Sequence, residues 1–147
     1  MGSFIVRFET DDGPRYCEWS TVVDAPTTEG MTLAHLRRWY KRQFGESGMA
    51  ELAGRLARAD AKGTSAINDK DLAQTVWLNR AGPDETMLSL PGLRALILDG
   101  ADDDELRQFI VVDPDPDDTG KGDELWLAWC AASGIDPKTR KGQEAAR

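Results

Sequence analysis

The segment from Tyr16 to Thr32 constrains the fold more than any other part of this sequence. It begins as a run rich in aromatic and β-branched residues, which is typical of a strand. The run stops at Pro26, and a polar loop then leads to Thr32, a residue suited to cap the start of a helix. A chain that passes so quickly from strand to helix favours a mixed α and β fold.

The residues before and within this segment predict a β-hairpin. Asp11–Pro14 has the composition of a tight turn, in which Gly13 can take a positive φ. Residues 4–9 alternate in the period of a half-buried strand, and Arg15–Val23 forms the returning strand. A hairpin alone is marginally stable in water, so we expect its apolar face to lie beneath the helix that carries Leu36 and Tyr40. That face is expected to consist of Phe4, Val6, Phe8 and Trp19.

Helical periodicity and capping residues predict the rest of the fold. Glycines at 45 and 63 are expected to end the first two helices, and Asn68 or Asp69 to cap the third. The short apolar run Phe109–Val112 is expected to be a buried strand that completes a sheet with the hairpin. The expected helices are Leu33–Phe44, Met49–Ala61, Leu72–Asn79, one that opens at Leu90 after Ser89, and Asp123–Ser133.

The sequence contains no internal repeat and no interdomain linker. We therefore predict a single α+β domain over residues 1–135, with an N-terminal β-hairpin in a small antiparallel sheet packed against four to five helices. Residues 136–147 are predicted to form a flexible C-terminal tail. A chain of 147 residues is long enough to bury a modest core of its own.

The composition argues against two classes of partner. The net charge of −8 disfavours nucleic acid, because neutralising phosphates requires a basic surface. No apolar run approaches the ~20 residues that span a bilayer, so no membrane association is expected. Cys17 and Cys130 are expected to be reduced, since no export signal is recognised at the N-terminus. Basic residues concentrate in 31–62 and acidic ones in 99–124, which we interpret as solvated or mutually pairing faces.

The acidic loop Asp113–Glu124 is the strongest candidate for a metal site. Carboxylates occupy the first, third, fifth and twelfth positions of the twelve, as in a calcium-binding EF-hand. However, Asp118 stands where an EF-hand needs glycine, and the preceding element is expected to be a strand. The favoured interpretation is an acidic connecting loop in which Asp123 caps the next helix and Glu124 complements its dipole. We therefore assign no metal ligand and no cofactor, although calcium binding stays open.

No catalytic residue is assigned either, and the chain is not expected to be an enzyme. His35 is the single histidine, and no serine or cysteine has the local setting of an activated nucleophile. Gly45–Gly48 lacks the preceding strand of a nucleophile elbow and is expected to connect two helices. Cys17 and Cys130 are expected to be small core residues.

The last predicted helix, Asp123–Ser133, is apolar on every side. Such a helix must be buried all round, within its own domain or against another chain. Tryptophan is common both in cores and in interface hot spots, and the core interpretation of the two tryptophans is favoured. We still expect part of this helix, either Trp126 or Leu127, to contact a protein partner or a second copy of the chain.

Three stretches resemble a family of small proteins of unknown function encoded by bacteriophages of actinobacteria. They are Tyr16–Pro26 with the following Gly30–Thr32, then Lys62–Ser65, then Asn79–Glu85, within a resemblance over about residues 5–90. The resemblance carries over no activity and no site residue. It implies a phage-encoded protein in the cytoplasm of a bacterial host. We thus expect a non-enzymatic accessory protein that binds a host or phage protein, or alternatively a virion component such as a minor capsid or head-tail protein.

Overall fold

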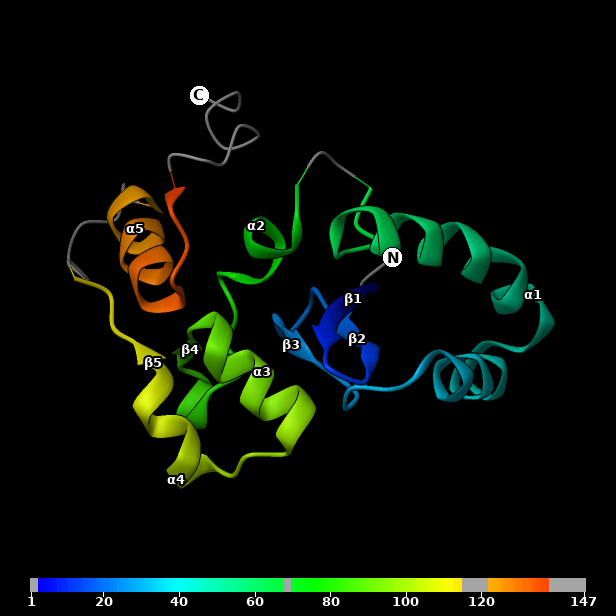
Figure 1. The fold of residues 1–147 in the computed structure, drawn as a ribbon, viewed down its shortest axis with the longest axis horizontal. Coiled ribbons are helices and arrows are strands. Elements are labelled where there is room, and N and C mark those ends of the chain that lie inside the picture. The colour runs from blue at the N-terminus through cyan, green and yellow to red at the C-terminus, as the bar shows by residue number, and fades with distance from the viewer. Residues whose placement is uncertain (1–2, 68–69, 115–121, 138–147) are drawn as a thin grey trace. The chain divides into compact units, whose positions relative to one another are not determined.

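The computed structural model describes residues 3–67, 70–114 and 122–137 (Figure 1). The chain divides into two compact units, Met1–Thr75 and Val76–Arg147, and each is described by itself below. Together they contain two small antiparallel sheets and five α-helices, so the predicted α+β class is confirmed. The prediction of one domain over residues 1–135 stays a prediction, and most of the expected tail, 138–147, lies outside the described residues.

The first unit begins with a three-stranded antiparallel sheet in the order β1 (Ser3–Thr10), β2 (Gly13–Ser20) and β3 (Ala25–Pro26). The predicted hairpin is confirmed, and Gly13 takes the positive φ of 105° that its turn requires. The second strand ends at Ser20, three residues earlier than predicted. Val22, at 81% exposure, lies in the turn that follows.

The outer edge of β1 carries backbone hydrogen bonds with Gly63 and Ser65. Tyr16 of the central strand β2 exchanges two further bonds, of 2.8 and 2.7 Å, with Met31, which follows β3 in the chain. Unpaired sheet edges are the usual templates for adding a strand from another chain. The β1 edge is therefore poorly suited to binding a partner by strand addition.

Helix α1 (Leu33–Lys62) covers one face of the sheet. The Thr32 hydroxyl accepts a hydrogen bond from the backbone of His35, and Gly63 ends the helix in the left-handed conformation, both as predicted. Gly45 is the one residue of α1 with non-helical backbone angles, φ 68° and ψ −161°. The two predicted helices are thus the two halves of α1, which turns sharply at Gly45 (Figure 1).

The face of the hairpin beneath α1 is not the one that the sequence predicts. Ile5 and Tyr16 share a core with α1 residues of both halves, including Leu36 and Tyr40. The expected residues Phe4, Val6, Phe8 and Trp19 are buried, but side chains alternate along a strand and these point to the opposite face. The prediction was wrong because both faces of this hairpin are buried, so the alternation of apolar residues does not identify the face beneath α1.

The second unit contains a two-stranded sheet and a set of short helices. The elements in chain order are α2 (Leu72–Val76), η1 (Pro83–Glu85), β4 (Met87–Leu88), α3 (Leu90–Asp99), α4 (Asp103–Leu106), η2 (Arg107–Phe109), β5 (Ile110–Val111) and α5 (Gly122–Ser133). Ser89 caps α3 through a hydrogen bond from Gly92, which confirms the predicted helix start. The predicted cap of the third helix, at Asn68 or Asp69, lies outside the described residues.

Two predictions for this unit were wrong. The strand predicted as buried over 109–112 is only Ile110–Val111 and is half-buried, with Val112 76% exposed. It does not extend the hairpin sheet, because Ile110 pairs with Leu88 of β4 instead. Helix α2 ends at Val76 rather than at Asn79. The cause is the buried Asn79 side chain, which donates to the carbonyls of Val76 and Leu88 and accepts from the Leu88 backbone N–H. These bonds take up backbone groups that a longer helix would otherwise have to satisfy.

The acidic run 102–105 begins a helix. The Asp102 side chain accepts a hydrogen bond from the backbone N–H of Glu105, and the Glu105 side chain accepts one from Asp102, which together form a capping box. The acidic side chains of the first turn also complement the positive end of the helix dipole. Helix capping therefore accounts for these acids without a ligand.

Candidate functional site

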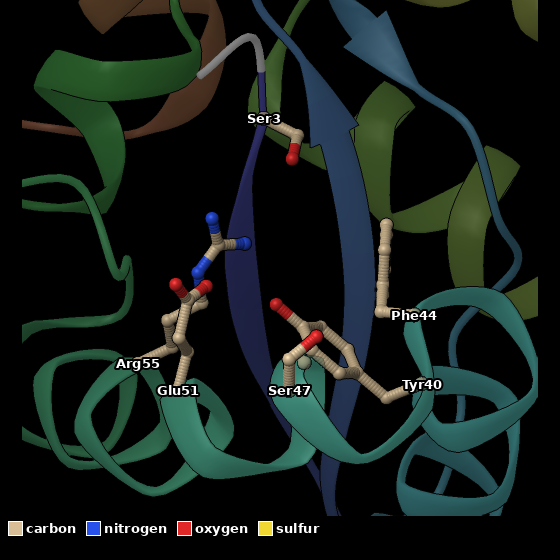
Figure 2. A pocket seen from close by; sticks show the side chains of 7 residues that line it. Ser3, Tyr40, Phe44, Ser47, Glu51 and Arg55 are labelled. Atoms are coloured by element: carbon tan, nitrogen blue, oxygen red, sulfur yellow. The ribbon is translucent and has the colours of Figure 1, made fainter.

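Two neighbouring depressions in the first unit form a groove beside the second half of α1, which we call the α1 groove. Figure 2 shows the side chains of the larger one. The aromatic pocket, of about 290 Å³, is lined by Ser3, Tyr40, Phe44, Ser47, Gly48, Glu51 and Arg55. The arginine pocket, of about 270 Å³, is lined by Ser3, Phe4, Thr21, Arg55, Arg58, Ser65, Ala66 and Ile67. The two pockets meet at Ser3 and Arg55, which line both.

The turn in α1 builds the wall of the aromatic pocket. Positions 47, 51 and 55 lie on one side of the helix because they are four residues apart. The rings of Tyr40 and Phe44, from the first half of α1, lie 4.7 Å apart between centroids. A Cβ atom on Gly48 would lie 2.2 Å from the Cβ of Phe44, so only glycine allows this close approach. The helix break and Gly48 therefore hold two aromatic rings against the second half of α1.

Arg55 is held in place by an ion pair and by an aromatic ring. Its Nη1 atom lies 3.6 Å from Oε1 of Glu18, and its guanidinium carbon lies 5.9 Å from the ring centroid of Tyr40. These are electrostatic contacts with a carboxylate and an aromatic face. Within the described part of the chain, no hydrogen bond joins the guanidinium to another residue. The N–H groups of Arg55 are thus available to a molecule in the groove.

Glu18 is a buried carboxylate behind this guanidinium. Its residue is only 4% exposed, in the middle of β2, and neither carboxylate oxygen has a hydrogen bond of regular geometry in the described structure. Burial raises the pKa of Glu18, and the nearby Ser3 hydroxyl and Arg55 guanidinium offset that rise in part. The Ser3 hydroxyl and the Arg55 charge therefore both stabilise the carboxylate form.

Replacing Glu18 with glutamine should stabilise the protein increasingly as pH rises above about 4.5, the ordinary pKa of this group. Because the folded-state pKa is raised, the folded protein holds the proton more tightly than the unfolded chain. Wild type therefore loses stability as pH rises from 4.5 through the raised pKa, whereas Glu18→Gln has no proton to lose there. Urea unfolding at several pH values measures this difference, with Glu51→Gln as the exposed control on the same groove. A constant difference between wild type and Glu18→Gln at every pH would contradict the account.

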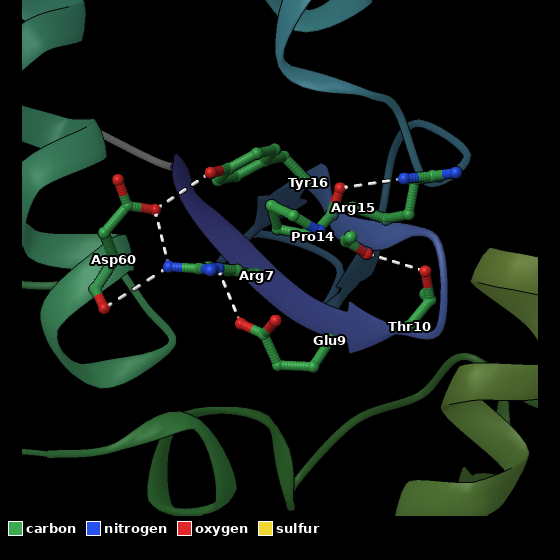
Figure 3. A network of polar contacts seen from close by, with 8 residues as sticks. Arg7, Glu9, Thr10, Pro14, Arg15, Tyr16 and Asp60 are labelled. Atoms are coloured by element: carbon green, nitrogen blue, oxygen red, sulfur yellow. Dashed lines mark hydrogen bonds and ion pairs between the residues drawn. The ribbon is translucent and has the colours of Figure 1, made fainter.

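A second polar cluster ties the sheet to the last turns of α1 (Figure 3). The Asp60 carboxylate accepts hydrogen bonds of 2.9 Å from the Tyr16 hydroxyl and from Arg7. Arg7 also forms a 2.8 Å ion pair with Glu9. Burial, followed by the bond to Asp60, raises the pKa of the Tyr16 hydroxyl. Each member has a partner within the cluster, so its role is to fix α1 on the sheet.

The candidate residues of the sequence do not assemble into a site. Cys17 and Cys130 are buried, lie in different units and are not in a disulfide, and burial raises the pKa of Cys17 far above its usual value. A thiol held in its neutral form is a poor nucleophile. His35 lies in the first turn of α1, where its backbone is capped by Thr32, and it lines neither pocket. Gly45–Gly48 connects the two halves of α1, as predicted.

Most of the acidic loop 113–124 lies outside the described residues, which do not include 115–121. Among the described residues, no three His, Cys, Asp or Glu side chains are grouped to hold a metal ion. Helix α5 begins at Gly122, one residue before the predicted start. Calcium binding by residues 113–124 therefore stays open.

Helix α5 has both buried and exposed apolar residues. The Trp126 ring lies 5.3 Å from that of Trp77 and 5.9 Å from that of Trp129, and the Trp129 indole N–H donates to the Leu88 carbonyl at 2.8 Å. Both α5 tryptophans are core residues, as the favoured interpretation held, so Trp126 is not a surface contact. Leu127 is 50% exposed. No described helix is both long enough and apolar enough to cross a membrane.

Sequence reasoning missed the groove and its two charged residues. Glu18 interrupts an otherwise aromatic and apolar stretch of β2, and that is a usable signal for a special position. Arg55 gives no such signal, since it is one of several basic residues on an amphipathic helix. Glu18 and Arg55 lie close together because of the face of the sheet that α1 covers, and the sequence pattern predicted the wrong face.

Comparisons of the chain with protein-family models, with curated proteins and with solved structures give no match. The resemblance to small actinobacteriophage proteins therefore stays a prediction.

Proposed function

We propose that this chain is a non-enzymatic phage accessory protein that binds a host or phage protein during infection. The α1 groove carries the proposal. It combines two aromatic rings, a guanidinium with unused donors and apolar side chains at its rim, where Phe44 is 46% and Ile67 83% exposed. Tyrosine and arginine are among the residues most enriched in interface hot spots. A partner that covered the rim would bury apolar surface and satisfy Arg55 together.

The arrangement and chemistry of the groove favour a protein over a substrate. Its two pockets, of about 290 and 270 Å³, share Ser3 and Arg55 and can receive neighbouring side chains of one partner segment. The lining hydroxyls come from Ser3, Thr21, Tyr40, Ser47 and Ser65, and Glu51 supplies a carboxylate. Nucleophilic catalysis needs a hydroxyl or thiol held beside a base, and in the described structure no hydrogen bond joins one of these hydroxyls to Glu51.

A second contact is proposed at α5. Leu127 is half exposed, and Ala131, one turn later, is exposed on the same side of the helix. Small and apolar residues in this arrangement suit close packing against another helix. We assign this surface to self-association of the chain. In the alternative function, a virion component, the same surface would pack against a neighbouring subunit.

Capture from infected actinobacterial cells tests the proposal. Ser47 is exposed at the aromatic pocket, so Ser47→Trp should fill that pocket without disturbing the core. Ala53 is exposed on the same half of α1 but does not line the groove, which makes Ala53→Trp the matched control. We expect a protein that co-purifies with wild type and Ala53→Trp and is lost with Ser47→Trp. Equal capture by both variants would contradict the role of the groove.

Mass spectrometry of purified phage particles separates the two functions. An accessory protein should be absent from particles or present in traces. Abundant peptides from this chain would favour the virion component and reject the accessory function.

A further inference from the structure

The arginine pocket has a distinct chemical character within the groove. Among the described residues, its lining contains two guanidinium groups, from Arg55 and Arg58, and no carboxylate. The chain as a whole carries a net charge of −8, so this pocket is a local exception. Clefts lined by one sign of charge concentrate ligands of the opposite sign.

Both guanidinium groups are oriented before any ligand arrives. Arg58 donates from Nε to the backbone carbonyl of Ser65 at 2.8 Å, which leaves its terminal N–H groups free of that bond. Arg55 is oriented by the Glu18 charge and the Tyr40 ring, without a hydrogen bond to a described residue. Glu18 itself is buried and does not line the pocket. Two preset cations with donors to spare favour an anionic ligand, because little ordering is required on binding.

The rest of the lining adds hydroxyl donors and an apolar wall. The Ser65 hydroxyl oxygen accepts a 2.7 Å bond from the Ile5 backbone, and within the described residues no acceptor takes its proton. Ile67, at 83% exposure, and Phe4 supply apolar surface on the same pocket. A ligand that fits must therefore join an anionic group to an apolar one within about 270 Å³.

We infer that the arginine pocket binds a carboxylate that a protein partner presents next to an apolar side chain, an inference that rests on the proposed function. A carboxylate is planar with two acceptor oxygens, which matches the fork of N–H groups on arginine. The apolar neighbour would cover Ile67. The carboxylate is either the terminus of the partner chain or an Asp or Glu side chain.

Titration of the full chain, followed by two-dimensional ¹H–¹⁵N NMR, tests the inference with small probes. N-acetylphenylalanine carries the carboxylate beside an aromatic ring, and N-acetylphenylalaninamide is the same molecule without the charge. We expect the acid, and not the amide, to shift the backbone signals of Arg58, Ser65 and Ile67 in a saturable way. An acetylated and amidated Phe-Glu peptide then separates a side-chain carboxylate from a terminal one. Equal shifts with acid and amide, no shifts at all, or tighter binding of inorganic phosphate than of either carboxylate would overturn the inference.

Charge variants give the second readout. Arg58→Gln should weaken binding of N-acetylphenylalanine roughly tenfold or more, because a charge-assisted hydrogen bond is lost. Arg42→Gln removes the same charge from an exposed position outside the groove and should leave the affinity unchanged. If the NMR spectrum shows that Arg58→Gln is unfolded, Arg58→Lys is used in its place. Arg58→Lys should bind N-acetylphenylalanine more weakly than wild type does, because lysine lacks the planar fork of N–H groups. Unchanged affinity in a folded Arg58 variant would reject the inference.

Failure of the pocket assignment and failure of the proposed function give different results. If carboxylates do not bind but a partner is still captured in a Ser47-dependent way, the pocket assignment is wrong and the binding function stands. If carboxylates bind and no partner is captured, the proposed function fails while the pocket stands.

Discussion

Trp19→Ala should lower the free energy of unfolding by about 3–5 kcal/mol, the usual penalty for emptying an aromatic site in a core. Trp19 is 2% exposed and stacks on Phe4 across the hairpin, with 6.2 Å between ring centroids. Chemical unfolding followed by circular dichroism measures the effect.

The control for this change is Val22→Ala, in the exposed turn after the same strand. It should cost no more than the ~0.5 kcal/mol of an ordinary surface substitution. A loss at Trp19 as small as that at Val22 would mean that the hairpin face carrying Trp19 is open to solvent, and the burial described above would be wrong.

Trp126→Glu should unfold the second unit. The side chain contacts the rings of Trp77 and Trp129 at 1% exposure, so a carboxylate placed there would be buried against aromatic rings. An unpaired buried charge costs several kcal/mol, comparable to the whole stability of many small domains. Loss of the dispersed NMR signals of the second unit is the expected observation.

Leu127→Glu, one residue later, should behave differently. Because Leu127 is half exposed, the variant should fold like wild type and lose the self-association that we assign to α5. Sedimentation analysis of wild type and Leu127→Glu measures that difference. A folded Trp126→Glu with lost association would instead place Trp126 in the contact and contradict its position in the core.

Features set by neighbouring residues were the predictable part of the fold. Gly13 in the hairpin turn, Thr32 and Ser89 as helix caps, and Gly45 and Gly63 as helix breakers act within a few residues of themselves. Their effect depends on backbone angles and local hydrogen bonds rather than on distant packing. The sequence therefore predicts β1, β2 and the two halves of α1 near their observed bounds, whereas β3 was not predicted.

Features that depend on distant contacts were not predictable. The buried Asn79 ends α2 early because it bonds to Leu88, nine residues away, and Ile110 pairs with Leu88 rather than with the hairpin. The residue pattern of a strand does not specify its partner, and a polar residue gives no sign that its bonds will be satisfied in a core.

The candidate site illustrates the same limit more sharply. Glu18 and Arg55 are 37 positions apart in sequence, and their contact at 3.6 Å follows from which face of the sheet α1 covers. Since both faces of the hairpin are buried, the apolar alternation could not specify that choice. For α5, the sequence showed an excess of apolar surface, but only packing determined that Trp126 is buried and Leu127 exposed.

The central claim is that a protein partner occupies the α1 groove, and site-specific photo-crosslinking in infected host cells tests it most directly. A photoreactive phenylalanine analogue would replace Ser47 at the groove or, as the control, Ala53 away from it. The account predicts one discrete crosslinked protein from the Ser47 position and none from the Ala53 position. Adducts of the same pattern from both positions, or none from Ser47 throughout infection, would contradict it.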